Sequence, residues 1–244
     1  MKISLIQNHP FTADLNANIA DHLKYAKQCA DLGVELLLFP ELSLTGYEPT
    51  LAAELALEKD DLRLQRLQEF SDEHHVTLGV GLPLRSPEGI CISLLFFRPG
   101  LPVIAHHKQY LHPDEEPYFS SGPNLPGIIV NGIQFGLAIC YELSVDEQLQ
   151  EQMQYNPAFY LTSVAKAPKG LATATTHLAQ IARKYNIITG MANSVGAANG
   201  TQCMGNTAVW DSGGHILGLL NQTDAGMMVF NTVDRSCNAH YFNV

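Results

Sequence analysis

The 244-residue sequence predicts an α/β fold in which one domain spans residues 1–244. Apolar runs typical of buried strands alternate along the whole chain with segments whose apolar residues recur at helical spacing. No Ser- or Pro-rich linker, charge block or fixed-period repeat interrupts this alternation. Long hairpin-like stretches mixed with crossover helices favour a mixed sheet or a sandwich over a simple doubly wound sheet.

The first half of the sequence predicts two helices and several strands. The helix over residues 16–32 has apolar residues at 4-3-4 spacing on one face, and Gly33 ends it. Residues 51–75 are helical in pattern but dense in charge, which indicates a mostly solvated face. The predicted strands are residues 2–7, 34–39, 76–84, 91–98, 102–110 and 128–130, the last leading into 134–141.

The second half repeats this organisation. A polar helix is predicted over residues 144–155 and an amphipathic one over residues 171–185. Turn signals such as Ser212-Gly213-Gly214 separate the last strands. These strands are residues 158–163, 187–192, 207–210, 215–220 and 227–233, and the last of them is expected to close the chain.

Composition excludes several classes of partner. The 14 Lys and Arg against 24 Asp and Glu give a net charge of −10, which disfavours nucleic acid and anionic membrane surfaces. No apolar stretch approaches the roughly 20 residues of a membrane span, and the N-terminus turns polar too early for a signal peptide. The five scattered cysteines include no Cys-x-x-Cys pair, as expected in the reducing cytoplasm.

Polar residues at predicted strand ends are the candidates for chemistry. Glu41 follows an apolar run and a proline, Lys108 opens a loop rich in polar and aromatic residues, and Cys140 ends the run over residues 136–139. Taken singly, each has an ordinary alternative. Free cysteines often simply pack in a core, and a loop glutamate usually faces solvent.

Cysteine nucleophiles need a base to take the thiol proton and positive charge to stabilise the thiolate, so we expect Cys140 to have a lowered pKa. No papain-like histidine signature surrounds it, and His177 and His215 are expected to be ordinary surface or packing residues. A buried carboxylate can act as the base, and a lysine can hold an oxyanion. Zinc is disfavoured because the histidines lack metal-ligand spacing.

The order of these motifs resembles the nitrilase, or carbon–nitrogen hydrolase, superfamily. Phe39-Pro40-Glu41 comes first, and Lys108 follows 67 residues after Glu41. Glu115-x-x-Tyr-Phe-x-x-Gly122 is next, and Cys140-Tyr-Glu142 begins 32 residues after Lys108. The likeness continues through residues 160–163, 191–196 and 205–208, so it covers nearly the whole chain.

That resemblance implies a fold, an assembly and a set of roles. The fold is a four-layer αββα sandwich that commonly pairs into a homodimer or a higher homo-oligomer. Cys140 resembles the family's nucleophile, Glu41 its general base, Lys108 its oxyanion-stabilising residue and Glu115 its supporting glutamate. No cofactor or metal is implied. The expected substrate-binding residues are Tyr47, Tyr141, Glu142, Ser163 and Asn193.

The expected activity is hydrolysis of a small linear, non-peptide amide to a carboxylate and ammonia or an amine, through a thioester. Hydrolysis of a nitrile or an N-carbamoyl compound is an alternative, as is a non-catalytic binding or scaffold protein on the same fold. A thiol redox sensor would need a resolving cysteine, and none is evident near Cys140. The sequence lacks the Arg-Phe-Pro that follows Cys-Tyr-Asp in many amidases of the superfamily, which leaves the substrate open.

Overall fold

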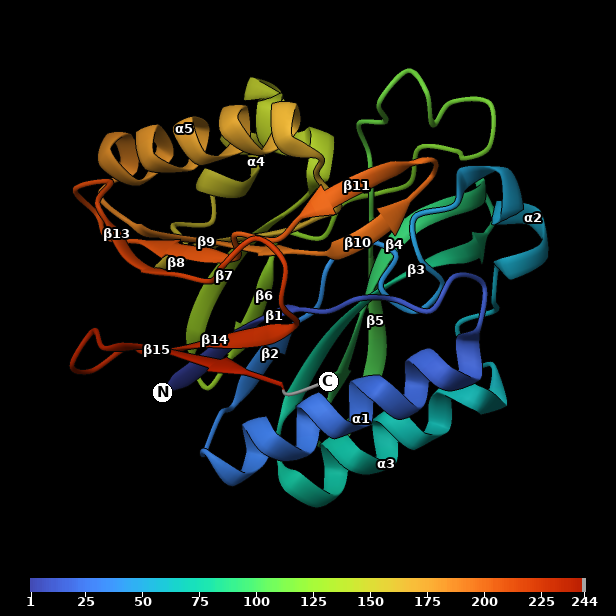
Figure 1. Ribbon diagram of the computed structural model, residues 1–244, viewed down its shortest axis with the longest axis horizontal. Coiled ribbons are helices and arrows are strands. Elements are labelled where there is room, and N and C mark those ends of the chain that lie inside the picture. The colour runs from blue at the N-terminus through green and yellow to red at the C-terminus, as the bar shows by residue number, and fades with distance from the viewer. Residues whose placement is uncertain (243–244) are drawn as a thin grey trace.

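The computed structural model describes residues 1–242 as a four-layer αββα sandwich (Figure 1). Two sheets pack face to face, and a pair of helices covers the outer face of each. The strand order is β15-β14-β1-β2-β3-β4-β5 in the first sheet and β13-β12-β9-β8-β7-β6 in the second. The predicted fold class is confirmed.

The first sheet is built from both ends of the chain. Its first strand, β1, pairs in parallel with β2 on one side and antiparallel with β14 on the other, where Lys2 lies opposite Asn231. The β2–β3 pair is also parallel, and the remaining pairs are antiparallel. The strands are β1 (Lys2–Gln7), β2 (Leu36–Leu38), β3 (Thr77–Ser86), β4 (Gly89–Arg98), β5 (Leu101–His107), β14 (Gly226–Asn231) and β15 (Cys237–Tyr241).

The second sheet has a parallel centre formed by β7, β8 and β9 and antiparallel strands at its edges. A separate two-stranded hairpin, β10 (Val195–Ala198) and β11 (Thr201–Met204), follows β9. The strands of the second sheet are β6 (Ile128–Val130), β7 (Ile133–Ile139), β8 (Phe159–Val164), β9 (Ile188–Asn193), β12 (Ala208–Trp210) and β13 (Ile216–Leu219).

The helices α1 (Leu15–Asp31) and α3 (Gln65–His74) cover the first sheet (Figure 1). The side chain of Asp14 caps α1 by accepting from the Ala17 N–H, and Gly33 follows the helix at φ +72°. The apolar face of α1 shares one core with Ile6 of β1 and with the alternate residues of β3 that face away from the second sheet.

The other pair of helices, α4 (Asp146–Met153) and α5 (Pro168–Tyr185), covers the second sheet. Pro168 opens α5 with the fixed φ that suits a first helical turn, and Asn186 ends it in the left-handed region at φ +53°. The buried residues of α5 recur at helical spacing and pack around Tyr160 of β8.

Aromatic side chains join the two sheets in the central core. Phe159 of β8 stacks on Phe135 of β7 at 5.1 Å between ring centroids. The same ring meets Phe230 of β14, in the opposite sheet, edge-on at 6.1 Å. Apolar residues of both sheets surround these rings, so burial of this common face holds the layers together.

Most predicted elements are present, and four of the differences from the prediction are the following. Residues 51–75 are not one helix but η1 (Pro49–Leu51), α2 (Ala52–Leu55), η2 (Leu62–Leu64) and α3, because Leu57 forms a bridge with Leu84 at the edge of β3. The strand predicted over residues 102–110 ends at His107. The hairpin β10–β11 and the last strand, β15, were not predicted, because few of their residues are buried.

Candidate active site

Glu41, Lys108 and Cys140 each follow a strand directly or within a few residues, and the sandwich brings these strand ends together. Glu41 lies in the turn after β2, Lys108 follows β5, and Cys140 follows β7 in the other sheet. A glycine on β3 makes room for the Glu41 turn. A Cβ atom on Gly81 would lie 2.4 Å from the Leu42 nitrogen and 2.5 Å from the Pro40 oxygen.

Lys108 lies between two carboxylates in a place with no solvent access. Its Nζ atom donates to Glu41 Oε1 at 2.8 Å and to Glu115 Oε1 at 2.7 Å. Burial by itself would lower the pKa of Lys108, but the two carboxylates outweigh it and raise that pKa above its ordinary value. The ammonium therefore stays charged, as a buried ion with good partners can.

Glu41 has one carboxylate oxygen to spare. Oε1 accepts from Lys108, whereas the buried Oε2 has no hydrogen-bond partner within residues 1–242. Burial raises the pKa of Glu41, the charge of Lys108 opposes that rise, and the charge of Glu115 adds to it. A buried carboxylate with a raised pKa and an unoccupied oxygen is suited to accept a proton.

Glu115 is fixed from three sides. The hydroxyl of Tyr47 donates to Oε1 at 2.8 Å, beside Lys108, and the His112 N–H donates to Oε2 at 2.8 Å. This carboxylate therefore holds the lysine in place and ties the loop after β5 to the loop after β2. Burial and the nearby carboxylates raise the pKa of Tyr47, so its hydroxyl remains a hydrogen-bond donor.

Cys140 stands in a strained backbone conformation at the start of a 3₁₀ turn, η3 (Cys140–Ser144). Its φ is +48°, which is unusual for a residue with a side chain and is seen often at functional sites. The thiol is partly buried. Burial and the charge of Glu41 raise the pKa of Cys140 to about 11, against the opposing charges of Lys166 and Lys108.

The expected lowering of the Cys140 pKa is therefore wrong. Desolvation and a neighbouring carboxylate both disfavour the thiolate, and two lysines only partly offset them. The free protein keeps this cysteine as a thiol at neutral pH. A nucleophile of this kind needs its proton taken by an adjacent base as it attacks.

A cavity of about 290 Å³ opens over Cys140. Loops from both sheets and the tip of the β10–β11 hairpin form its walls, and two residues expected to bind substrate, Tyr47 and Tyr141, are among them. The residues that line it are Tyr47, His112, Asp114, Glu115, Cys140, Tyr141, Ala165, Lys166, Ala167, Gly170, Ala198, Asn199 and Thr201.

The other three residues expected to bind substrate do not line this cavity, because their side chains bind backbone groups. Glu142 accepts from the Ile139 and Gln109 N–H groups, both at 2.8 Å, and so links the residue before Cys140 to the residue after Lys108. Ser163 donates to the Phe39 carbonyl at 2.8 Å. Asn193 accepts from the Lys166 N–H at 2.8 Å. This geometry favours positioning roles for all three.

Sequence reasoning missed five polar residues of the cavity wall, namely His112, Asp114, Lys166, Asn199 and Thr201. Lys166 follows β8, so the strand-end pattern that singled out Lys108 also applies to it. Asn199 and Thr201 belong to the hairpin tip, whose Asn199-Gly200 pair is a turn signal. His112 lies in the loop between Lys108 and Glu115, where the sequence offered several polar candidates.

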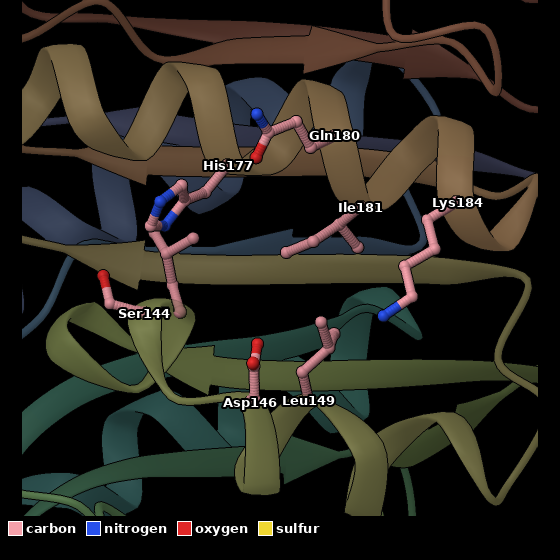
Figure 2. Close-up of a pocket in the computed structure, with 8 residues that line it drawn as sticks. Ser144, Asp146, Leu149, His177, Gln180, Ile181 and Lys184 are labelled. Carbon is pink, nitrogen blue, oxygen red and sulfur yellow. The ribbon is translucent and has the colours of Figure 1, made fainter.

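A second cavity, of about 250 Å³, lies between η3, α4 and α5 on the outer side of the second sheet (Figure 2). His177, Gln180 and Lys184 reach it from α5, opposite Asp146 and Leu149 of α4. It contains none of the residues predicted for catalysis. Within residues 1–242 no group of three or more His, Cys, Asp or Glu side chains is placed to hold a metal ion.

Comparison with known proteins identifies the family. The sequence model of carbon-nitrogen hydrolases matches residues 2–237. An (R)-stereoselective amidase from Pseudomonas sp. is 27% identical over 222 residues, which cover 89% of this chain and 80% of the amidase. A glutamine-dependent NAD(+) synthetase from Thermotoga maritima is 24% identical, and the match covers 89% of this chain but only 39% of the synthetase.

Solved structures agree with the sequence matches. The amidase from Nesterenkonia sp. AN1 superposes with a TM-score of 0.85 at 25% identity, covering 96% of this chain and 93% of that one. A mutant of it, at TM-score 0.84 and 25% identity over 94% and 89% of the two chains, shows the acetamide moiety of fluoroacetamide added covalently at the active-site cysteine. The expected resemblance is confirmed, and the chain belongs to the carbon-nitrogen hydrolase family.

Proposed function

We propose that this protein is a cysteine-dependent hydrolase of small linear amides and that Cys140 is its nucleophile. The observation that carries the proposal is the buried Glu41–Lys108–Glu115 cluster beside a partly buried thiol at the floor of a cavity. Family membership and the active-site cysteine adduct of the Nesterenkonia amidase support it.

The first half of the reaction forms a thioester. Glu41 takes the proton of the Cys140 thiol through its unoccupied oxygen, and the sulfur attacks the amide carbon. The electron pair of the carbonyl moves to oxygen, where Lys108 and the Tyr141 backbone N–H stabilise the negative charge. The carbonyl then re-forms, the C–N bond breaks, and Glu41 returns its proton to the leaving nitrogen, which departs as ammonia or an amine.

The second half releases the acid. Water enters the position that the amine has left, and Glu41 takes one of its protons as the oxygen attacks the thioester carbon. The same donors stabilise the second oxyanion. When the C–S bond breaks, Glu41 returns the proton to sulfur, which restores the Cys140 thiol and frees the carboxylic acid. Glu115 contacts no reacting atom in either half of the reaction and holds Lys108 in place.

Replacement of the thiol is the direct test. Cys140→Ala is expected to fold normally and to release no ammonia from any amide that the wild-type protein cleaves. Cys237→Ala is the matched control, because Cys237 is also partly buried but lies on β15, away from the cavity. Ammonia release that persists in Cys140→Ala would show that another group is the nucleophile.

Amides, nitriles and N-carbamoyl compounds are the three candidate substrate classes for this site. We propose a linear amide, since the Pseudomonas relative is an amidase and one structure of the Nesterenkonia amidase holds butyramide. A panel of acid amides, their nitriles and their N-carbamoyl analogues distinguishes the three. A protein that converts none of them, and that no cysteine-directed substrate analogue labels at Cys140, would be a binding or scaffold protein instead.

We also propose that the whole chain is one carbon–nitrogen hydrolase domain that works as a homodimer or a higher homo-oligomer. The cavity between α4 and α5 supports the assembly, because Leu149 and Ile181 give that outer face an apolar floor (Figure 2). Sedimentation equilibrium over a range of concentrations tests it. A species of 26.7 kDa at all concentrations would contradict the proposal.

We propose the cytoplasm as its location. All five cysteines, which lie within the described residues, are free thiols, as a reducing compartment favours. None of the helices in residues 1–242 is long and apolar enough to span a membrane. Cell fractionation with an antibody against the protein tests this location.

A further inference from the structure

The cavity over Cys140 contains a lysine that the proposed reaction does not use. Lys166 follows β8 and lines the cavity together with Cys140 and Tyr141. Its backbone is fixed on both sides, since its N–H donates to Asn193 Oδ1 at 2.8 Å and its carbonyl accepts from the Met204 N–H at 3.2 Å. The fold therefore holds the base of this side chain firmly at the cavity wall.

The ammonium of Lys166 has no carboxylate partner among residues 1–242. Lysine and arginine ion pairs within 4.0 Å in that part of the chain involve Lys27, Arg63 and Lys108. This is notable in a chain with 24 acidic and 14 basic residues. Of the acidic residues of the same cavity, Glu115 pairs with Lys108, and Asp114 is exposed and lies 3.5 Å from His112.

The first turn of α5 adds positive potential to the same wall. A Cβ atom on Gly170 would lie 3.8 Å from the Cγ and Cδ atoms of Lys166, so the lysine side chain runs along this turn. No side chain caps the start of α5, and its first turn has no acidic residue. Because a helix N-terminus carries partial positive charge, Lys166 and the N-terminus of α5 both attract an anion to the same part of the cavity wall.

The positive charge of Lys166 also acts on the sulfur of Cys140. The charge of Lys166 lowers the pKa of Cys140, against the larger effects of burial and Glu41. Lys166 is therefore within electrostatic range of the atom that would carry the acyl group. A ligand joined to that sulfur can extend along the wall toward the ammonium within a cavity of about 290 Å³.

We propose that Lys166 binds a carboxylate of the substrate, so that the preferred substrates are linear amides whose acyl part ends in a carboxylate, such as monoamides of dicarboxylic acids. This inference rests on the proposed function, because the acyl group has to lie on Cys140. Lys166 acts here as a specificity residue and takes no part in breaking the C–N bond.

Two amides of nearly equal shape test this directly. Succinamate carries a carboxylate where butyramide carries a methyl group, so the ratio of their kcat/KM values measures recognition of the anion. The wild-type protein is expected to favour succinamate. Lys166→Met keeps most of the side-chain length but loses the charge, and it is expected to lower the ratio about tenfold or more, as loss of a charge-assisted hydrogen bond does.

Lys169→Met is the matched control. Lys169 is an exposed lysine in the same helical turn that does not line the cavity, and its loss is expected to change the ratio by less than about twofold, since exposed charges are screened. Lys166→Glu is expected to reverse the wild-type preference. A wild-type preference for butyramide, or an equal loss for both amides in Lys166→Met, would overturn the inference.

A failure of the proposed function gives a different result. In that case neither amide releases more ammonia with the wild-type protein than with Cys140→Ala. Calorimetric titration of Cys140→Ala with succinamate then decides the question on its own. Binding that weakens about tenfold when Lys166→Met is added supports an anion site at Lys166, and binding that is absent or unchanged contradicts it.

Discussion

At the scale of single residues, the site raises the pKa of its base and of its nucleophile together. Burial is the largest cause for both Glu41 and Cys140, and the charge of Glu41 adds to the rise in the pKa of Cys140. Lys108 moderates the effect on both without losing its own charge. The thiol therefore stays protonated until substrate binds, while the carboxylate becomes a stronger base than a glutamate in water.

The pH dependence of kcat/KM follows from these directions. Glu41 has to be ionised to accept the thiol proton, so activity falls as the pH decreases through its pKa. That pKa is raised, so the acid limb should lie above the ordinary value of 4.5. Neutralisation of Lys108 should not reduce activity below pH 10.5, because its pKa is raised too.

A pH–rate profile with an amide substrate, measured by ammonia release, tests this prediction. Glu41→Gln provides the control, since it removes the base and is expected to lose activity by about 10² to 10⁴ at every pH. An acid limb centred at or below pH 4.5 would show that Glu41 is not the group whose ionisation controls the rate.

The sequence allowed the residues of the cluster to be predicted better than those of the cavity wall. Glu41, Lys108 and Cys140 lie near strand ends, a position that sequence pattern reveals, and the packing of the two sheets brings these ends together. Whether a neighbouring polar side chain points into the cavity depends on tertiary contacts. Glu142 and Asn193 therefore resembled binding residues in sequence but bind backbone, and Lys166 went unnoticed.

At the scale of elements, β3 is a rigid support for the turn that carries Glu41. Gly79 and Gly81 of this strand both lie close to neighbouring segments, but Gly79 lies against side chains and Gly81 against backbone. A Cβ atom on Gly79 would meet the side chains of Phe96 and Leu38 at 2.6 and 2.9 Å. The three heavy atoms nearest to a Cβ atom on Gly81 would all be backbone atoms of residues 40–42, which cannot rotate away.

Substitutions at Gly79 and Gly81 separate a loss of protein stability from a displacement of the catalytic base, Glu41. Gly79→Ala and Gly81→Ala are each expected to cost about 1–3 kcal/mol of stability through overpacking. Only Gly81→Ala is expected to lower kcat as well, about tenfold or more, because it shifts Glu41. Urea unfolding and amide hydrolysis, both at 25 °C, check the pair. Equal kcat values in the two folded variants would contradict a positioning role for Gly81.

Elements with strong apolar periodicity were predicted to within a few residues, whereas three of the weakly buried strands were not. The helix predicted over residues 16–32 is α1, Leu15–Asp31. In contrast, β10, β11 and β15 alternate poorly in burial because each has a largely exposed side, so their sequences lack the usual strand signal. The tip of the β10–β11 hairpin nevertheless forms one wall of the cavity.

At the scale of the whole molecule, the common core between the sheets predicts a single cooperative unfolding transition. Trp210, the only tryptophan, is buried on β12 of the second sheet and reports on that layer by fluorescence. Far-UV circular dichroism reports on both sheets. The two urea transitions are expected to coincide, as they do for a single domain.

Phe159 is the residue that tests the join between the sheets. Phe159→Ala removes a ring that touches both layers and is expected to cost about 3–5 kcal/mol of stability. Phe11→Ala is the control, since the Phe11 side chain is 51% exposed and its loss should change stability by less than about 0.5 kcal/mol. Transitions that separate in the wild-type protein would indicate sheets that unfold independently.

The pairing of β1 with β14 has a consequence for synthesis on the ribosome. β1 lies between β2 and β14, yet more than 200 residues separate β1 from β14 in the chain. At about 5–20 residues per second, the growing chain keeps one edge of β1 unpaired for roughly 10–45 s. During that interval an apolar strand edge is open to wrong partners, so chaperones that cover nascent chains should matter for the yield of this protein.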